Sequence, residues 1–452
     1  MIEELGSIEE NQTWSLVDLP SGHNAIGLKW VFKVKKDSQG AMVKHKARLV
    51  AKGFVQQQGI DFEEVFAPVA RMESVRLLIA LAAQESWSLH HMDVKSAFLN
   101  GDLEEEVYVQ QPTGFVKKGE EHKVYKLHKA LYGLKQAPRA WNTKLHNTLI
   151  SLGFEKCPLE HAIYKRGIDA SRLLIGVYVD DLLITAASEK EIGRFKKQMK
   201  ELFKMSDLGL LSFYLGIEVH QSRDGITLCQ EAYATKILVN CGMDDCNPSH
   251  TPMEAKLKLS KWSEAPAVDP TDYRSIVGSL RYLVNTRADL AYSVGIKQKV
   301  VALSSCDAEY IAGAAAACQG VWLSRLYADL MGEQPKQVKL HIDNKSTISL
   351  CKNPVHHDRS KHIDVKFHYI RECVEEGRME VEHVNTNDQL ADILTKSLGK
   401  LTRASEEVVS AMAAMNPNFI AEQQALYEAA RTQAAARNIH AVQPDAEAAL
   451  ST

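Results

Sequence analysis

No run of apolar residues in the 452-residue sequence approaches the roughly 20 residues that a membrane span needs. The first residues, MIEELGSIEENQTW, are acidic and polar, so the sequence predicts no secretory signal. The eight cysteines are scattered without any C-x-x-C pair, and Cys241 and Cys246 are the closest two. This pattern favours reduced thiols over a disulfide framework or a zinc site. We therefore expect a protein of the cytoplasm or nucleus that is neither secreted nor embedded in a membrane.

A strong overall positive charge is also missing, because the formal net charge is −3. Positive charge is instead concentrated between Leu28 and Lys52, where the only acidic residue is Asp37. The basic residues there are Lys29, Lys33, Lys35, Lys36, Lys44, Lys46, Arg48 and Lys52. Such a strip suits a polyphosphate or nucleic-acid backbone, and it equally suits a solvated hairpin face. Charge alone leaves both interpretations open.

Apolar runs bounded by turn residues predict several strands. Residues 28–54 are expected to form two strands around the turn Asp37-Ser38-Gln39-Gly40. Residues 89–94 and 338–344 are each expected to form a short strand, and 173–186 two apolar strands interrupted by Asp180-Asp181.

Helical periodicity appears between these strands. We expect helices at 72–84, at 138–152 and at 362–377. Another helix should follow a capping box of Ser188 and Glu191. Its buried face should contain Ile192, Phe195, Met199, Leu202 and Phe203. The irregular alternation of strands and helices predicts an α+β fold.

Asp180 and Asp181 form the strongest local signal for chemistry. They lie between two apolar strands, where two charges are costly unless a cation neutralises them. Asp-Asp is also common in turns, but a Gly or Asn that usually accompanies such turns is absent here. A third carboxylate, Asp93, ends the strand that is expected to begin at Leu89. If the two segments are neighbours, the three carboxylates could hold two Mg²⁺ ions.

Longer motifs then resemble one family. Y-V-D-D at 178–181 resembles the Y-x-D-D box of reverse transcriptases, and the remainder resembles the Pol polyprotein of copia-type LTR retrotransposons over residues 3–398. The matching motifs occur in the family's order. They are KARLVAKGF (46–54), FAPVARMESVR (66–76), MDVKSAFLNGDL (92–103), KALYGLKQAPRAW (129–141), VYVDDLLIT (177–185), YLGIEV (214–219), YRSIVGSLRYL (273–283), VALSSCDAEY (301–310), NPVHHDRSKHID (353–364) and DQLADILTK (388–396).

The resemblance implies a reverse-transcriptase right-hand fold and roles for particular residues. Asp93, Asp180 and Asp181 would be the catalytic carboxylates that hold two Mg²⁺ or Mn²⁺ ions. Phe98 would form a wall beside the sugar that excludes a 2′-hydroxyl; the alternative is an ordinary core phenylalanine. The remaining nucleotide-binding residues would be Lys46, Arg48, Tyr132, Gly133 and Lys135. The expected partners are an RNA template, a DNA or tRNA-type primer and deoxynucleoside triphosphates.

The second half resembles the family's ribonuclease H domain, but one part is missing. Glu309, Asp343 and Asp392 match three of its four carboxylates. A long segment with the fourth carboxylate is reduced here to Gly295 and Ile296. We therefore expect an incomplete sheet in an inactive ribonuclease H region, with the strand near Leu340 lacking neighbours on one side. A zinc site among the histidines of 356–368 is disfavoured, because no cysteine accompanies them.

The expected organisation follows from these motifs and from composition. Residues 240–272 resemble a linker or an irregular subdomain, and residues 401–452 contain fifteen Ala and no Lys. The expected parts are an N-terminal lead-in (1–27), reverse transcriptase fingers and palm (28–225), a thumb or connection remnant (226–296), a truncated ribonuclease H-like α/β region (297–398) and an Ala-rich helical tail with no assigned role (399–452).

Three functions compete. The first is an RNA-directed DNA polymerase, which the intact carboxylate triad favours. The second is a catalytically defective retrotransposon remnant that only binds nucleic acid, which the internal deletion and the tail favour. The third is a structural fusion product whose tail determines its partners. The sequence shows no protease, integrase or zinc-knuckle segment, so we expect at most part of a polyprotein, enclosed in virus-like particles in an intact element.

Overall fold

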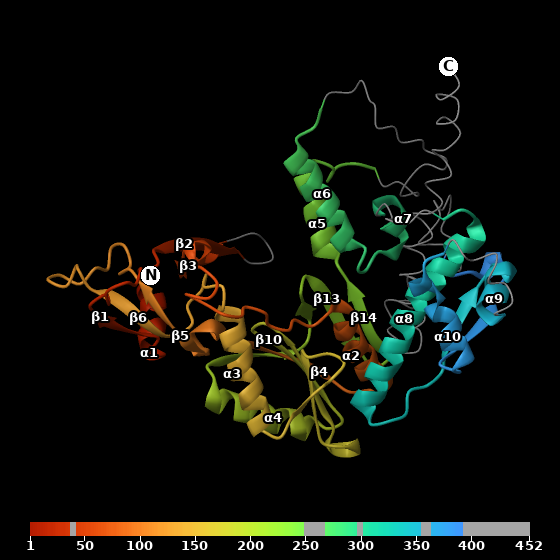
Figure 1. Cartoon of the computed structure of the whole chain (residues 1–452), viewed down its shortest axis with the longest axis horizontal. Helices are drawn as coiled ribbons and strands as arrows, with labels where there is room; N and C mark the ends of the chain where they lie inside the picture. Colours follow the sequence, from red (N-terminus) through yellow and green to blue (C-terminus); the bar gives the residue numbers. More distant parts are fainter. Residues whose placement is uncertain (37–41, 248–266, 296–301, 354–362, 392–452) are drawn as a thin grey trace. The chain divides into compact units, whose positions relative to one another are not determined.

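The computed structural model describes residues 1–36, 42–247, 267–295, 302–353 and 363–391 (Figure 1). The turn expected at 37–40, much of the linker expected at 240–272 and the tail expected at 399–452 lie outside these ranges. No helix in the described ranges has both the length and the apolar character that crossing a bilayer requires. All eight cysteines are free thiols, as their spacing predicted.

The chain forms two compact units. Unit 1 comprises Met1–Ala70, His90–Ile184 and Ser188–Gly209. Unit 2 comprises Arg71–Leu89, Thr185–Ala187 and Leu210–Thr452. Helices and strands alternate irregularly in both, which confirms the mixed α and β content expected from the sequence.

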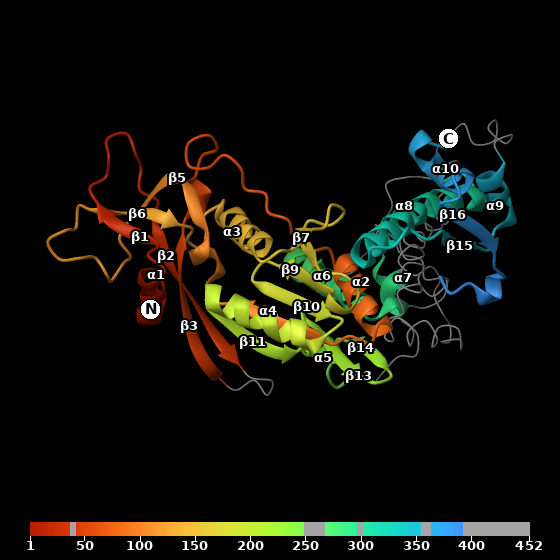
Figure 2. The same cartoon turned by 90° about the horizontal axis from the view of Figure 1, so that it is seen from below.

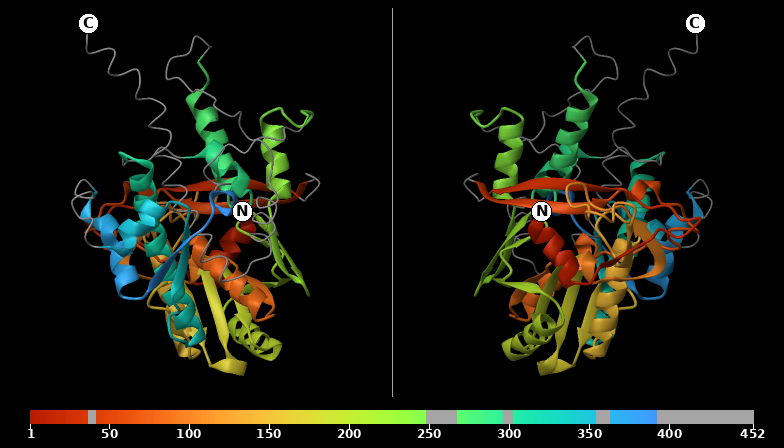
Figure 3. Two further views of the ribbon diagram at one scale, coloured as in Figure 1. Left: turned by 90° about the vertical axis from the view of Figure 1, so that its right-hand side faces the viewer. Right: turned by 90° about the vertical axis from the view of Figure 1, so that its left-hand side faces the viewer.

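Unit 1 begins with a helix and a long hairpin. These are α1 (Ile2–Glu10), β2 (Leu28–Lys36) and β3 (Met42–Ala51), and Figure 3 shows the hairpin as a two-stranded ribbon. Val31 pairs with Arg48 and Lys33 with Lys46, so these residues share one face of the hairpin. Trp30 pairs with Leu49 on the other face, which is apolar. The two strands expected within 28–54 are confirmed.

The base of the hairpin belongs to a hydrophobic core. Leu28, Leu49 and Ala51 pack there with Ile8 of α1 and with residues of a second sheet. That sheet has the order β1-β6-β5. Its strands are β1 (Trp14–Val17), β6 (Val124–Lys129) and β5 (Asp102–Val109), and the short helices η1 (Gly53–Val55) and η2 (Ala97–Asn100) also lie in unit 1.

A six-stranded sheet forms the rest of the unit 1 framework, with the order β11-β4-β10-β9-β8-β7 (Figure 2). The strands are β4 (Leu89–Val94), β7 (Glu155–Lys156), β8 (Ile163–Arg166), β9 (Leu173–Tyr178), β10 (Asp181–Ala186) and β11 (Met205–Leu210). The first five residues of β9 are all buried, as expected for a continuous apolar run. The strands expected at 89–94 and within 173–186 are confirmed.

Two helices, α3 (Ala137–Ser151) and α4 (Glu189–Leu202), each bury one apolar stripe. Two ring contacts connect this pair of helices, Trp141 with Phe203 and Phe154 with Phe195, both with centroids 5.3 Å apart. Two details of the expected α4 are wrong. The hydroxyl oxygen of Ser188 accepts a hydrogen bond from the backbone N–H of Lys190. Among the described contacts the Glu191 side chain accepts no hydrogen bond from the backbone N–H of Ser188, so the expected capping box does not form. Leu202 is 52% exposed, because it lies at the end of the helix beyond the apolar stripe.

The N-terminal part of unit 2 contains one apolar helix and a small antiparallel sheet. The helix α2 (Met72–Gln84) is confirmed, and the sheet has the order β12-β13-β14. The strands are β12 (Phe213–Tyr214), β13 (Ile217–Ser222) and β14 (Gly225–Cys229), followed by α5 (Glu231–Asn240), α6 (Pro270–Leu283) and α7 (Ala291–Val294). Tyr233 and Tyr282 join α5 to α6 through an edge-to-face ring contact at 5.4 Å.

The C-terminal part of unit 2 is built around the long helix α8 (Ser305–Met331), which buries its alanines in a separate core cluster. The other elements are β15 (Val338–Ile342), α9 (Lys345–Lys352), α10 (Tyr369–Glu375) and β16 (Met379–His383). In the part of the chain that the structure describes, β15 pairs in parallel with β16 and with no other strand. The strand near Leu340 thus has a neighbour on one side only among the described residues, as the sequence predicted. The helix expected at 362–377 is shorter: a 3₁₀ turn (Val365–His368) precedes α10.

Candidate functional site

The candidate site lies at the turn between β9 and β10. β9 ends at Tyr178 and β10 begins at Asp181, so Val179 and Asp180 form the tip. Val179 has φ 57°, a left-handed conformation that is strained for a β-branched residue. The indole Nε1 of Trp141, on α3, donates a hydrogen bond of 2.7 Å to the carbonyl oxygen of Val179. A buried aromatic side chain thus holds the strained turn.

β4 brings the third carboxylate to this turn. It is the neighbour of β10 in the sheet, and the N–H of Val94 donates to the carbonyl oxygen of Asp180 at 2.9 Å. Because side chains alternate along a strand, Asp93 and His91 lie on the same face of β4. The Nε2 atom of His91 lies 2.8 Å from Oδ1 of Asp181. The structure therefore gathers Asp93, Asp180 and Asp181 at one end of two neighbouring strands.

The electrostatics show how crowded these carboxylates are. Burial is the largest cause of the raised pKa of Asp180, and the charges of Asp181 and Asp93 also raise it, while a backbone hydrogen bond and the charge of Arg48 lower it. Oδ1 of Asp181 faces His91. Three carboxylates at one end of a sheet can hold a pair of cations about 3.5–4 Å apart. The hard oxygen donors fit divalent cations of the magnesium class.

Three side chains that contact one another through the ring of Tyr132 lie beside the carboxylates. The guanidinium carbon of Arg48 lies 4.2 Å from the ring centroid of Tyr132. The ring of Phe98, which η2 presents five residues after Asp93, lies 4.9 Å from the same ring. Burial raises the pKa of Tyr132 to about 12, although the positive charge of Arg48 opposes that shift. Tyr132 is thus in direct contact with both Arg48 and Phe98.

Acidic residues of α1 lie on the other side of Arg48. Its Nη1 atom is 3.6 Å from a carboxylate oxygen of the buried Glu4. Burial raises the pKa of Glu4, while Arg48 and, more weakly, Lys46 lower it. Lys46 lies two residues before Arg48 in β3 and thus on the same basic face of the hairpin.

Two glycines allow the hairpin to meet the segment 129–141. The N–H of Ala51 donates to the carbonyl oxygen of Tyr132 at 2.7 Å. Gly133 has φ 91°, and a methyl group there would overlap the carbonyl oxygen of Ala51. A methyl group at Gly53 would likewise overlap the carbonyl oxygen of Gly133. Both positions therefore need glycine.

Lys135 makes contacts away from the carboxylates. Its Nζ atom donates to the carbonyl oxygen of Gln56 at 3.1 Å and lies 5.0 Å from the ring centroid of Phe62. Lys135 thus contacts the segment that follows β3, whereas Tyr132 contacts Arg48 within the hairpin.

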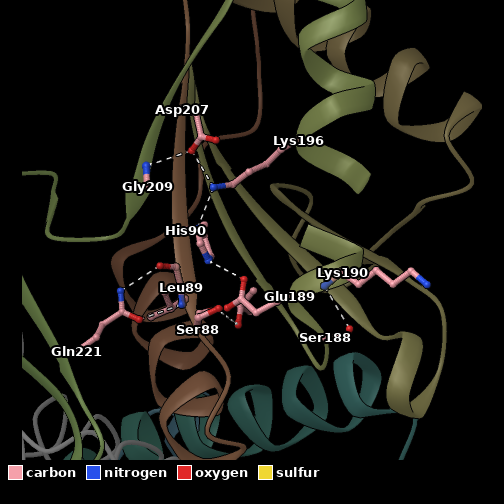
Figure 4. Close-up of polar contacts among 11 residues, drawn as sticks. Ser88, Leu89, His90, Ser188, Glu189, Lys190, Lys196, Asp207, Gly209 and Gln221 are labelled. Carbon is pink, nitrogen blue, oxygen red and sulfur yellow. Dashed lines mark hydrogen bonds and ion pairs between the residues drawn. The ribbon is translucent and has the colours of Figure 1, made fainter. Parts of the chain in front are cut away.

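A polar network around His90 supports β4 (Figure 4). Because side chains alternate along a strand, it lies on the face opposite Asp93. The Nζ atom of the buried Lys196 lies 2.8 Å from Nδ1 of His90 and 2.7 Å from Oδ1 of Asp207. The other ring nitrogen of His90 lies 3.3 Å from Glu189. These contacts tie β4 to α4 and β11. Neither this network nor the contact of His91 with Asp181 is predictable from the sequence motifs.

The residues matched to ribonuclease H are described only in part. Glu309 is buried in α8, and Asp343 follows the end of β15 directly. α8 packs against that strand, where Gly313 faces the side chain of Ile342. Asp392 lies outside the described residues, as do three of the four histidines considered for zinc.

Comparison with known proteins defines the class. The family model "Reverse transcriptase (RNA-dependent DNA polymerase)" matches residues 11–255, more than half of the sequence. The chain belongs to the reverse transcriptase family. Membership implies divalent metal ions and nucleic-acid templates and primers.

The similar proteins are copia-type Pol polyproteins, which confirms the resemblance found in the sequence. The retrovirus-related Pol polyprotein from transposon TNT 1-94 of Nicotiana tabacum is 35% identical over 88% of this chain and 36% of its own length. That from transposon RE1 of Arabidopsis thaliana is 34% identical over 88% of this chain and 32% of its own length. A putative transposon Ty5-1 protein of Saccharomyces cerevisiae is 39% identical over 45% of this chain and 67% of its own. The chain thus spans about a third of the length of the two plant relatives.

Proposed function

We propose that this chain is the RNA-directed DNA polymerase of a copia-type retrotransposon, which adds deoxynucleotides to a primer 3′-hydroxyl on an RNA template. The observation that carries the proposal is the convergence of Asp93, Asp180 and Asp181 at the ends of β4, β9 and β10. In this proposal residues 28–225 form the fingers and palm, and residues 226–296 are what remains of the thumb or connection.

Asp93, Asp180 and Asp181 would hold two Mg²⁺ or Mn²⁺ ions. When bound, the two ions lower the pKa of the primer hydroxyl and stabilise the leaving pyrophosphate. The role of the chain would be to hold the three carboxylates in position. Trp141 fixes the backbone at Val179, and His91 contacts a carboxylate oxygen of Asp181.

The side chains of Arg48, Tyr132 and Phe98, which lie beside the carboxylates, would bind the incoming nucleotide. Arg48 and Lys46 would contact the triphosphate, for which the planar guanidinium of Arg48 is the better bidentate ligand. The ring of Tyr132 holds that guanidinium in place. Phe98, in contact with the same ring, would stand against the sugar and exclude a 2′-hydroxyl. Gly133 and Lys135 would form part of the same nucleotide-binding surface.

Residues 297–398 would be an inactive ribonuclease H-like remnant. Two observations support this part of the proposal. Only Gly295 and Ile296 remain of the segment that would contain the fourth carboxylate, and β15 has a single paired neighbour in the described ranges. Glu309, Asp343 and Asp392 would therefore lack both a ligand and part of the scaffold.

Primer extension on an RNA template with Mg²⁺ tests the proposal. We expect extension by the purified full chain and its loss in Asp181→Asn, because the amide cannot supply the negative charge. Asp18→Asn is the matched control, because that carboxylate is 78% exposed and directly follows β1, outside the site. Retained extension in Asp181→Asn would refute the triad. A chain that binds primer–template without extending it would be the binding remnant considered above.

A further inference from the structure

A second group of possible metal ligands lies on the small sheet of unit 2 (Figure 1). Glu218 and His220 are two residues apart on β13, and Glu218 pairs with Cys229 on β14. Side chains two apart on a strand share a face, and so do directly paired residues. The register of this hairpin therefore places a carboxylate, an imidazole and a thiol on one face.

The distances among these three side chains match those of a metal site. The Sγ atom of Cys229 lies 3.4 Å from Oε2 of Glu218 and 3.4 Å from Nε2 of His220. All three ligand atoms lie within 4.8 Å of one another. A tetrahedral zinc ion, with bonds of about 2.3 Å to sulfur and about 2.0–2.1 Å to nitrogen or oxygen, separates such atoms by about 3.5 Å. The group thus needs little rearrangement to enclose an ion.

The surroundings orient the carboxylate toward the other two groups. Oε1 of Glu218 accepts the backbone N–H of Ala232, in the first turn of α5, at 2.9 Å. Its second oxygen is the one that faces Cys229. A hydrogen bond that fixes a ligand from behind is typical of protein metal sites. Glu218 and Cys229 are half-buried and His220 is exposed, so an ion can enter from solvent.

We propose that Glu218, His220 and Cys229 form a site for Zn²⁺ or a divalent transition-metal ion of similar softness. The thiol excludes Mg²⁺ and Ca²⁺ as the preferred occupants, since those ions bind oxygen ligands. A thiolate and a carboxylate together neutralise the two charges of the ion. Three protein ligands leave a fourth position for water. The bound ion would link β13, β14 and the start of α5, independently of the polymerase carboxylates.

Binding would exchange a proton for the ion. In the metal-free chain the thiol of Cys229 donates its hydrogen toward Oε2 of Glu218. As the sulfur–metal bond forms, the S–H bond breaks and its proton passes to solvent. Affinity should therefore fall as the pH is lowered.

Cobalt(II) absorption spectroscopy tests the site in the full chain, with a reductant that contains no thiol. The assay also contains excess Mg²⁺, which occupies sites made of oxygen ligands alone and so keeps Co²⁺ from binding there. We expect one equivalent of Co²⁺ to produce sulfur-to-cobalt charge-transfer absorption, which Zn²⁺ then abolishes. Cys229→Ser should lose the absorption, and Glu218→Gln should weaken binding at least tenfold. Cys241→Ser is the matched control, because that half-buried thiol lies in the same unit but outside the group.

The stability of the chain provides a second measurement. Zn²⁺ should raise the thermal unfolding midpoint of the wild type and of Cys241→Ser, and it should leave that of Cys229→Ser unchanged. The proposal is overturned if the folded wild type shows no charge-transfer absorption. It is equally overturned if Cys229→Ser keeps the absorption, or if Glu218→Gln and His220→Ala bind Co²⁺ as tightly as the wild type.

Discussion

Asp207 should stabilise the strand that carries Asp93, and the structure gives the size of the effect. Burial alone would raise the pKa of Asp207, but hydrogen bonds from Lys196, Lys200 and the N–H of Gly209 lower it from 3.8 to about 2. Its side chain is 27% exposed and that of Lys196 is 11% exposed, so solvent screens the pair weakly. A pKa difference of nearly two units corresponds to about 2 kcal/mol. Asp207→Asn should therefore destabilise this region by about 2 kcal/mol at pH 7.

The pH dependence follows from the direction of the shift. Because the pKa in the folded chain lies below the ordinary value, the stabilisation is complete above the ordinary value. It is lost as the pH falls toward the folded-state pKa of about 2. At pH 3 about half of the contribution should remain. The difference between wild type and Asp207→Asn should shrink accordingly.

Hydrogen–deuterium exchange of β4 and β11 measures the effect locally. At pH 7 their amides should exchange about 30-fold faster in Asp207→Asn than in the wild type. Asp102→Asn is the matched control. It removes an ion pair with Lys144 whose side chains are 59% and 42% exposed, so its effect should stay below about 1 kcal/mol. Equal exchange in wild type and Asp207→Asn, or a difference that is the same at pH 7 and pH 3, would refute the reasoning.

Three further predictions concern the proposed polymerase and its C-terminal region. Phe98→Val should raise the ratio of ribonucleotide to deoxynucleotide incorporation, and an unchanged ratio in a folded variant would make Phe98 an ordinary core residue. Gly133→Ala should cost more than about 2 kcal/mol of stability in urea unfolding, because its methyl group overlaps backbone. Gly119→Ala, with φ 83° but open space around it, should cost only about 1 kcal/mol. The chain should not hydrolyse an RNA–DNA hybrid with Mg²⁺ or Mn²⁺; cleavage that disappears in Asp343→Asn would show that another carboxylate completes the site.

The sequence by itself determined the local structure and the class of protein. Apolar runs and their periods predicted β4, β9, β10, α2 and α3 nearly to the residue, because alternation and helical spacing depend on neighbouring residues. The motif order predicted the family, which the comparisons confirm. The local signals were weaker at helix ends. The capping box expected at Ser188 does not form, and the helix expected at 362–377 is shorter in the structure. Both features lie at helix ends, where contacts with residues distant in the sequence influence the structure.

Only the tertiary structure decided which distant side chains meet. The order of strands placed β4 beside β10, so His91 contacts Asp181 across 90 residues of sequence. The close approach of Gly53 and Gly133 joined two motifs that the sequence separates by 80 positions. The hairpin register brought Cys229 to Glu218 and His220, although the spacing of the cysteines had argued against zinc. The catalytic roles of the carboxylates stay predictions. The physical reason for this division is that pairing between strands depends on contacts far apart in the chain, which no local pattern encodes.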